Sequence, residues 1–130
     1  MIDYLKKIIW KPEGMEHLKT PANREASFVL IYDKLTVGEL RLKDGKWLFE
    51  YSTAFKQQSE VKPIVDFPDL DKKYEAEELW PFFASRIPSL NQPAVQEVIR
   101  EEKLKEDDLV DLLKFFGKLT ITNPFKLVSS

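Results

Sequence analysis

The chain has 130 residues, of which 43% are hydrophobic and 32% are charged, and its formal net charge at pH 7 is −2. This length predicts one domain with a small core, and the balanced charge argues against direct nucleic-acid binding, which usually needs a basic surface. The absence of cysteine excludes disulfides and thiolate metal sites. Because no signal peptide and no apolar run of roughly 20 residues is recognisable, we expect a cytoplasmic protein without a membrane span.

The N-terminal part, residues 1–26, is predicted to form a helix followed by a linker. Leu5 and Ile9 lie one helical turn apart within residues 2–10, which have the pattern of an amphipathic helix. This helix either docks on the core or serves as a separate partner-binding arm. The residues that follow it are polar and rich in turn formers, so we expect the main domain to comprise residues 27–130.

An antiparallel sheet is predicted after the linker. Three runs, at residues 28–32, 36–42 and 47–51, have the composition and alternation of strands. The Asp-Gly pair at residues 44–45 favours a type I′ turn, because glycine adopts positive φ freely. Gly38 within the second run indicates a bulge or a close backbone approach. Three or four such strands need a cover on one face.

The cover is predicted to come first from residues 53–74. Pro63 and Pro68 are incompatible with a helix through this segment and keep it extended. Ile64 and Phe67 are its apolar anchors. We therefore expect the segment to lie along the sheet with these two side chains beneath it.

Residues 75–88 are predicted to form a helix that joins the sheet to the C-terminal part. The segment begins with acidic residues, as the first turn of a helix prefers. Pro81 is compatible with a helix only near its start, so the regular part is expected to begin near Leu79. Its large apolar side chains are expected to hold the sheet against the later helices, whereas Trp80 and Arg86 are expected to face outward.

Two further helices are predicted, one capped by Asn91 and one opened by Asp107 and Asp108 and followed by Gly117 as its C′ residue. Their apolar faces consist of Val95, Val98, Ile99, Leu104, Leu109, Leu112, Leu113 and Phe116. Residues 119–122 have the composition of a short strand. The predicted fold class is therefore α+β: an antiparallel meander of about three to four strands packed against about three C-terminal helices, with an extra N-terminal helix at residues 2–10.

No residue set typical of catalysis is recognisable. His17 is the only histidine, and it lies in the polar linker without the further ligands that a metal site needs. The four glycines are scattered, unlike those of a phosphate-binding loop. Neighbouring carboxylates on a helix do not face each other. We expect a protein that is not an enzyme and needs neither metal nor cofactor. An unrecognised small enzyme is kept as an alternative.

A series of short motifs runs from the second predicted strand to the last predicted helix. In chain order they are Val37-Gly38-Glu39-Leu40, Asp44-Gly45, Phe49-Glu50-Tyr51, Pro63-Ile64, Phe67-Pro68, Pro81-Phe82-Phe83, Ile87-Pro88, Asp108-Leu109, Leu112-Leu113 and Phe116-Gly117. This order resembles the N-terminal subdomain of the HipA family of serine/threonine kinase toxins over residues 28–117. The ATP-binding and catalytic portions of that family have no counterpart here, so the resemblance implies no catalytic residue.

The resemblance implies a free-standing, HipS-like antitoxin that binds and inhibits a separately encoded HipT-like kinase. A HipB-like DNA-binding protein would be reached only through that kinase. The implied contact surface surrounds Trp80 and includes Tyr74, Pro81, Ser85 and Arg86, since aromatic residues and arginine are enriched in interfaces. Trp80 as a plain core residue is an equal alternative. The alternative function is an accessory or self-associating domain without a kinase partner.

Overall fold

The computed structural model describes residues 20–21, 23–117 and 124–130. The predicted N-terminal helix at residues 2–10 and the predicted strand at residues 119–122 lie outside the described residues, as does His17. The expected division of the chain after residue 26 stays a prediction.

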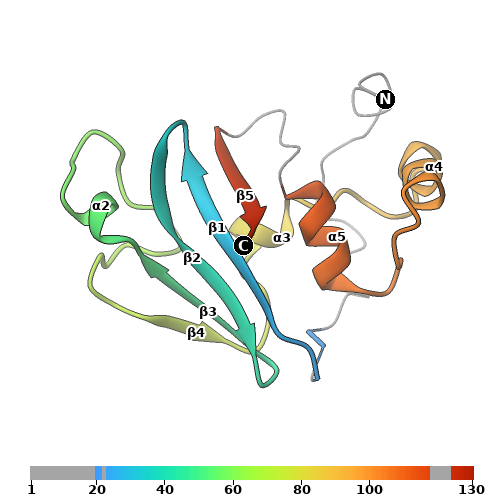
Figure 1. Ribbon diagram of the computed structural model, residues 1–130, viewed down its shortest axis with the longest axis horizontal. Helices are drawn as coiled ribbons and strands as arrows, with labels where there is room; N and C mark the ends of the chain where they lie inside the picture. Colours follow the sequence, from blue (N-terminus) through green and yellow to red (C-terminus); the bar gives the residue numbers. More distant parts are fainter. Residues whose placement is uncertain (1–19, 22, 118–123) are drawn as a thin grey trace.

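The described residues form an α+β domain around a five-stranded antiparallel sheet (Figure 1). In chain order the elements are β1 (Ala26–Tyr32), β2 (Leu35–Lys43), β3 (Lys46–Tyr51), α2 (Thr53–Lys56), β4 (Tyr74–Ala76), α3 (Pro81–Ala84), α4 (Pro93–Glu101), α5 (Leu109–Phe116) and β5 (Phe125–Ser129). The strand order across the sheet is β4-β3-β2-β1-β5. The predicted α+β class is confirmed, with β4 and β5 added to the two edges of the predicted three-stranded meander.

The two predicted features of the meander are present. Asp44 and Gly45 have φ values of 53° and 75°, the two positive angles of a type I′ turn. At Gly38 the register between β1 and β2 shifts and leaves Val37 as the extra residue of a bulge. A Cβ atom on Gly38 would also lie 2.5 Å from the carbonyl oxygen of Glu50. Gly38 therefore serves both the bulge and the close approach of β3.

One face of the sheet is buried and carries the core. Its buried side chains are Phe28, Leu30, Val37, Leu40, Leu42, Trp47, Phe49, Tyr51 and Leu127. The segment between α2 and β4 covers this face with Ile64 and Phe67, as predicted, and α3 adds Phe83. The rings of Phe49 and Phe67 lie 4.4 Å apart, and those of Phe67 and Phe83 lie 5.9 Å apart. These three rings join the sheet, the covering segment and α3 into one core.

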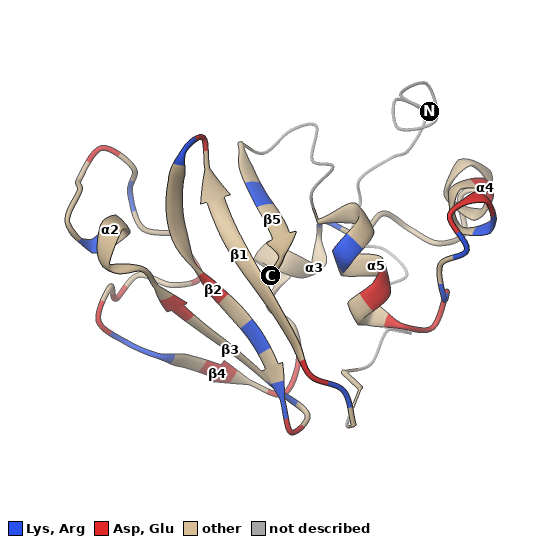
Figure 2. Cartoon of the chain, viewed as in Figure 1, with Lys and Arg blue, Asp and Glu red and all other residues tan. Residues whose placement is uncertain are grey.

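The opposite face of the sheet carries charged residues at alternate positions. Glu39 and Arg41 on β2 form an ion pair, and Glu50 follows on β3 (Figure 2). Lys46 on β3 pairs with Glu75 on the edge strand β4, with 3.1 Å between Nζ and Oε1. The alternation of apolar and charged residues is what a sheet with one covered face requires.

Residues 75–78 do not begin a helix, contrary to the prediction. Glu75 lies in β4, opposite Leu48 of β3. Acidic side chains suit a solvated edge strand as well as the first turn of a helix, and pairing with β3 decides between the two. The prediction that the regular helix starts beside Pro81 is confirmed, because Pro81 is the first residue of α3.

Helices α4 and α5 lie to one side of the sheet (Figure 1). The residues predicted for their apolar faces are buried except Leu104, which is half-buried. The cap of α4 is Gln92 rather than the predicted Asn91. Gly117 directly follows the last residue of α5, so the predicted end of this helix is confirmed, and its φ is −61°. Among the described residues, no helix combines the length and the apolar character that a membrane crossing needs.

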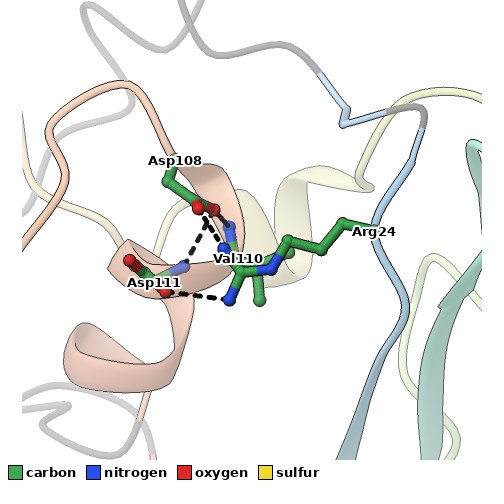
Figure 3. Close-up of polar contacts among 4 residues, drawn as sticks. All are labelled: Arg24, Asp108, Val110 and Asp111. Carbon is green, nitrogen blue, oxygen red and sulfur yellow. Dashed lines mark hydrogen bonds and ion pairs between the residues drawn. The ribbon is translucent and has the colours of Figure 1, made fainter.

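Asp108 caps α5 and also ties it to the approach to β1 (Figure 3). Its Oδ1 accepts from the main-chain N–H of Val110 at 3.0 Å, as an N-cap side chain does. Its Oδ2 forms an ion pair with Arg24, whose other terminal nitrogen lies 3.0 Å from Asp111. This pairing joins residues more than 80 positions apart in the sequence.

Candidate functional site

The predicted contact surface is built around α3, which is a single helical turn. Trp80 is its N-cap residue with extended backbone angles, and the N–H of Ala84 donates to the Trp80 carbonyl at 2.9 Å. Leu79 precedes the N-cap residue and lies outside the helix. A single turn has no sustained face, so the surrounding core decides which side chains of residues 79–86 are buried.

Trp80 packs against the core while remaining half-buried. Its ring meets Phe67 edge-on with the centroids 5.0 Å apart, and Phe83 with the centroids 6.4 Å apart. Tyr74 also contacts Phe67, with the centroids of these two rings 4.9 Å apart. The structure thus brings Tyr74 and Trp80 together on Phe67, and each keeps part of its surface exposed.

Arg86 is buried, contrary to the prediction that it faces outward. Only 3% of the residue is exposed. Its Nη1 donates to the carbonyl oxygens of Gly117 at 3.2 Å and Phe125 at 2.9 Å, and its guanidinium lies 5.2 Å from the ring of Phe82. Burial lowers the pKa of Arg86 to about 10. Within the described part of the chain, its Nε and Nη2 have no hydrogen-bond partner.

The position of Arg86 has a clear physical reason. Phe125 begins the edge strand β5, and the N–H of Leu127 donates to the Gly117 carbonyl at 3.1 Å. Arg86 and the Gly117 carbonyl therefore form hydrogen bonds with main-chain groups on the outer edge of β5. Without these bonds the same groups would be free to pair with another strand. Arg86 supports the site from within and is not a contact residue of the surface.

Pro81 and Ser85 are exposed and share one depression. Its volume is about 530 Å³, and it is lined by Lys62, Pro63, Ile64, Val65, Asp66, Pro81, Phe82, Ser85 and Phe125. The depression lies between the segment that covers the sheet, α3 and the start of β5. The structure therefore adds residues 62–66 to the predicted surface. The one sequence signal for them was the pair of prolines, Pro63 and Pro68, that encloses Ile64, Val65, Asp66 and Phe67.

The surface of this site offers mainly apolar contacts. Most of the surface that lines the depression is apolar, and its charged groups are those of Lys62 and Asp66. Among the residues that the structure describes, no group of three histidine, cysteine or carboxylate side chains is placed to hold a metal ion. The arrangement is suited to contact with apolar side chains of another molecule.

The comparisons with known proteins agree with the resemblance seen in the sequence. The family model of the HipA N-terminal domain matches residues 29–121. No curated protein matches the chain. The matched region contains β2 to α5 and all of the residues predicted for the contact surface. The chain belongs to the HipA N-terminal domain family.

Proposed function

We propose that this protein is a HipS-like antitoxin: a non-catalytic module that binds a separately encoded HipT-like serine/threonine kinase in the cytoplasm and inhibits it. The observation that carries the proposal is the match to the HipA N-terminal domain over residues 29–121, because this domain is a non-catalytic subdomain of a toxin family. A HipB-like DNA-binding protein would meet this chain only through the kinase.

The contact surface supports the same function. Tyr74 and Trp80 present half-exposed aromatic rings held on Phe67, and Pro81 and Ser85 line an open apolar depression. Rings that are already held in place lose little conformational freedom on binding, which is one reason that aromatic residues dominate interfaces. In this proposal Arg86 acts by holding α3 and β5 together behind the surface.

The test uses a shortened HipA-like kinase from the same genome. Ser85→Arg places a long charged side chain at the exposed end of α3, and we expect at least about a 10-fold loss of affinity for the kinase with unchanged folding stability. Ala54→Arg is the matched control, because Ala54 is also a small exposed residue of a short helix, α2, which lies at the left of Figure 1, away from α3. Inhibition of autophosphorylation is measured beside binding.

Trp80→Ala refines the result. Because the Trp80 ring contacts Phe67 and Phe83, this variant is expected to lose some stability and considerably more inhibition. Equal losses in both would remove Trp80 from the interface and leave it in the core. If the wild-type chain binds no such kinase and instead sediments as a self-associated species, the alternative of a self-associating domain replaces the proposal.

A further inference from the structure

The strand β4 forms one edge of the sheet (Figure 1), and its outer side has no partner strand among the described residues. The N–H of Ser52, directly after β3, donates to the Val37 carbonyl of β2 at 2.8 Å. Main-chain groups of successive residues in a strand point to opposite sides, so the even-numbered residues of β3 bond to β2 and the odd-numbered ones to β4. The odd-numbered residues lie opposite Tyr74 and Ala76. Glu75 therefore directs its N–H and C=O away from the sheet.

Residues 73–77 present a row of such outward groups. The same alternation directs the N–H and C=O of Lys73 and Glu77 outward, together with those of Glu75. Among the described residues one of these groups is already bonded, because the Glu77 carbonyl accepts from the Thr20 hydroxyl at 2.7 Å. A carbonyl oxygen can accept a second hydrogen bond. The chain bends at Glu77 and Glu78, so a partner strand would pair along residues 73–77 and no further.

The charges on this edge are arranged by sign. Charged residues commonly protect an edge strand from pairing. Here Lys72 and Lys73 precede Glu75, whereas Glu77 and Glu78 follow it, and all of them are exposed. A second copy in parallel orientation would place like charges side by side. A second copy in antiparallel orientation, centred on Glu75, would place each lysine opposite a glutamate, so the edge is complementary to itself.

The outward groups fix the register of an antiparallel pair. Glu75 of each copy would exchange both hydrogen bonds with Glu75 of the other, and Lys73 would do the same with Glu77. The two Glu75 carboxylates carry like charge, which opposes the pairing. Each of them is already bound by Lys46 of its own chain, with 3.1 Å between Nζ and Oε1. Glu75 and, more weakly, Glu77 raise the pKa of Lys46. This lysine therefore offsets part of the repulsion at the centre.

We propose that the free chain forms a two-fold dimer in which β4 pairs antiparallel with β4 of a second copy and joins the two five-stranded sheets into one. Lys73 pairs with Glu77 and Lys72 with Glu78 across the axis. This inference goes beyond the proposed function and does not depend on it, because no kinase takes part. The paired edge is short, so the dimer is weak, with a Kd on the order of 100 μM.

The main test reverses the charges on each half of the edge. One variant carries Lys72→Glu and Lys73→Glu, and the other carries Glu77→Lys and Glu78→Lys. Each variant alone has like charges at every cross-strand pair, so its Kd for self-association, measured by sedimentation equilibrium, should rise about 10-fold or more. An equimolar mixture of the two variants restores opposite charges at every pair and should associate within a few-fold of the wild type.

The matched control for the first variant is Lys34→Glu with Lys105→Glu. Both lysines are exposed and lie outside β4, so the net charge changes equally while the edge stays intact. Its Kd should stay close to that of the wild type. Recovery in the mixture also shows that the variants are folded, because a misfolded chain would not pair.

A cysteine cross-link tests the register, since the chain has no cysteine of its own. In the proposed pair the two Glu75 Cα atoms lie about 5.5 Å apart, within the range that a disulfide spans. Glu75→Cys should therefore form a covalent dimer under mild oxidation. Glu77→Cys is the matched control, because its two copies would lie about 14 Å apart along the strands and should cross-link much more slowly.

Each outcome decides the proposal. A dimer that both charge reversals weaken and their mixture restores supports the pairing of β4. A wild-type chain that stays monomeric up to about 1 mM overturns it. A dimer that survives both reversals, a mixture that does not recover, or equal cross-linking at positions 75 and 77 assigns self-association to another surface and also overturns it.

Discussion

The sheet and the two C-terminal helices are held in place by different kinds of interaction. The strands pair along their length by main-chain hydrogen bonds, and the aromatic side chains of one face form the core beneath them. The helical pair adds apolar contacts to this core. Its polar attachments, within the part of the chain that the structure describes, include the pairing of Arg24 with Asp108 and Asp111. They also include the hydrogen bonds that the Arg86 guanidinium and the Leu127 N–H donate to the Gly117 carbonyl.

This difference predicts which substitutions lower the folding stability of each half. Main-chain pairing and apolar burial depend little on any single charged group. An attachment through two arginines depends on each of them, and on ionic strength where the pair is partly exposed. The following substitutions test this contrast from the largest expected effect to the smallest.

Arg86→Ala is expected to have the largest effect. It removes the donor to the carbonyls of Gly117 and Phe125, leaves an unfilled volume beside Phe82, and should lower the free energy of unfolding by about 2 to 4 kcal/mol. Hydrogen exchange should accelerate in β5 and α5 more than in β3. Arg100→Ala, at an exposed position of α4, is the control. Equal acceleration in β3 and β5 would show that Arg86 does not serve the helical side specifically.

Tyr51→Phe is the corresponding change on the sheet side. It removes the hydroxyl that holds the turn at residues 64–67, and we expect a loss of about 1 to 2 kcal/mol in chemical unfolding at pH 7, because the Ile64 N–H and the Phe67 carbonyl lose a buried partner.

The same variant has a pH dependence with a defined sign. Burial raises the pKa of Tyr51 from 10.0 to about 12. Below pH 10 the phenol is neutral in the folded and the unfolded chain, so its contribution is complete. As pH rises toward 12 the unfolded chain loses the proton first, and the stability contributed by Tyr51 falls. The advantage of the wild type over Tyr51→Phe should therefore shrink over this range. An advantage that grows with pH would contradict the buried, neutral phenol.

Arg24→Ala should have the smallest effect. The Arg24 side chain is 33% exposed, so solvent screens its pairing with Asp108 and Asp111, and we expect a loss of about 1 kcal/mol or less. The loss should decrease when salt is raised, as seen in urea midpoints at low and high NaCl. Arg41→Ala removes the more exposed pair with Glu39 and should change the midpoint less. A salt-independent loss would indicate that Arg24 acts through packing.

The sequence by itself determined the local elements whose signals are short-range. Alternation predicted β1, β2 and β3, and the Asp-Gly pair predicted the turn with two positive φ angles. The apolar spacing of α4 and α5 predicted their buried faces, and Pro81 predicted the start of α3. These features depend on neighbours within a few positions, where periodicity and turn chemistry act.

Only the tertiary structure decided which side chains around α3 are buried and which are exposed. β5 pairs with a strand almost 100 positions earlier, and no local pattern contains that pairing. The Phe125 carbonyl on the outer edge of β5 accepts a hydrogen bond from Arg86, and this side chain is therefore buried, although the frequency of arginine in interfaces led us to expect an exposed residue. Val65 is exposed because Tyr51 fixes the turn around it. Burial depends on contacts between distant segments, and a single helical turn with no sustained face carries too little information to predict them.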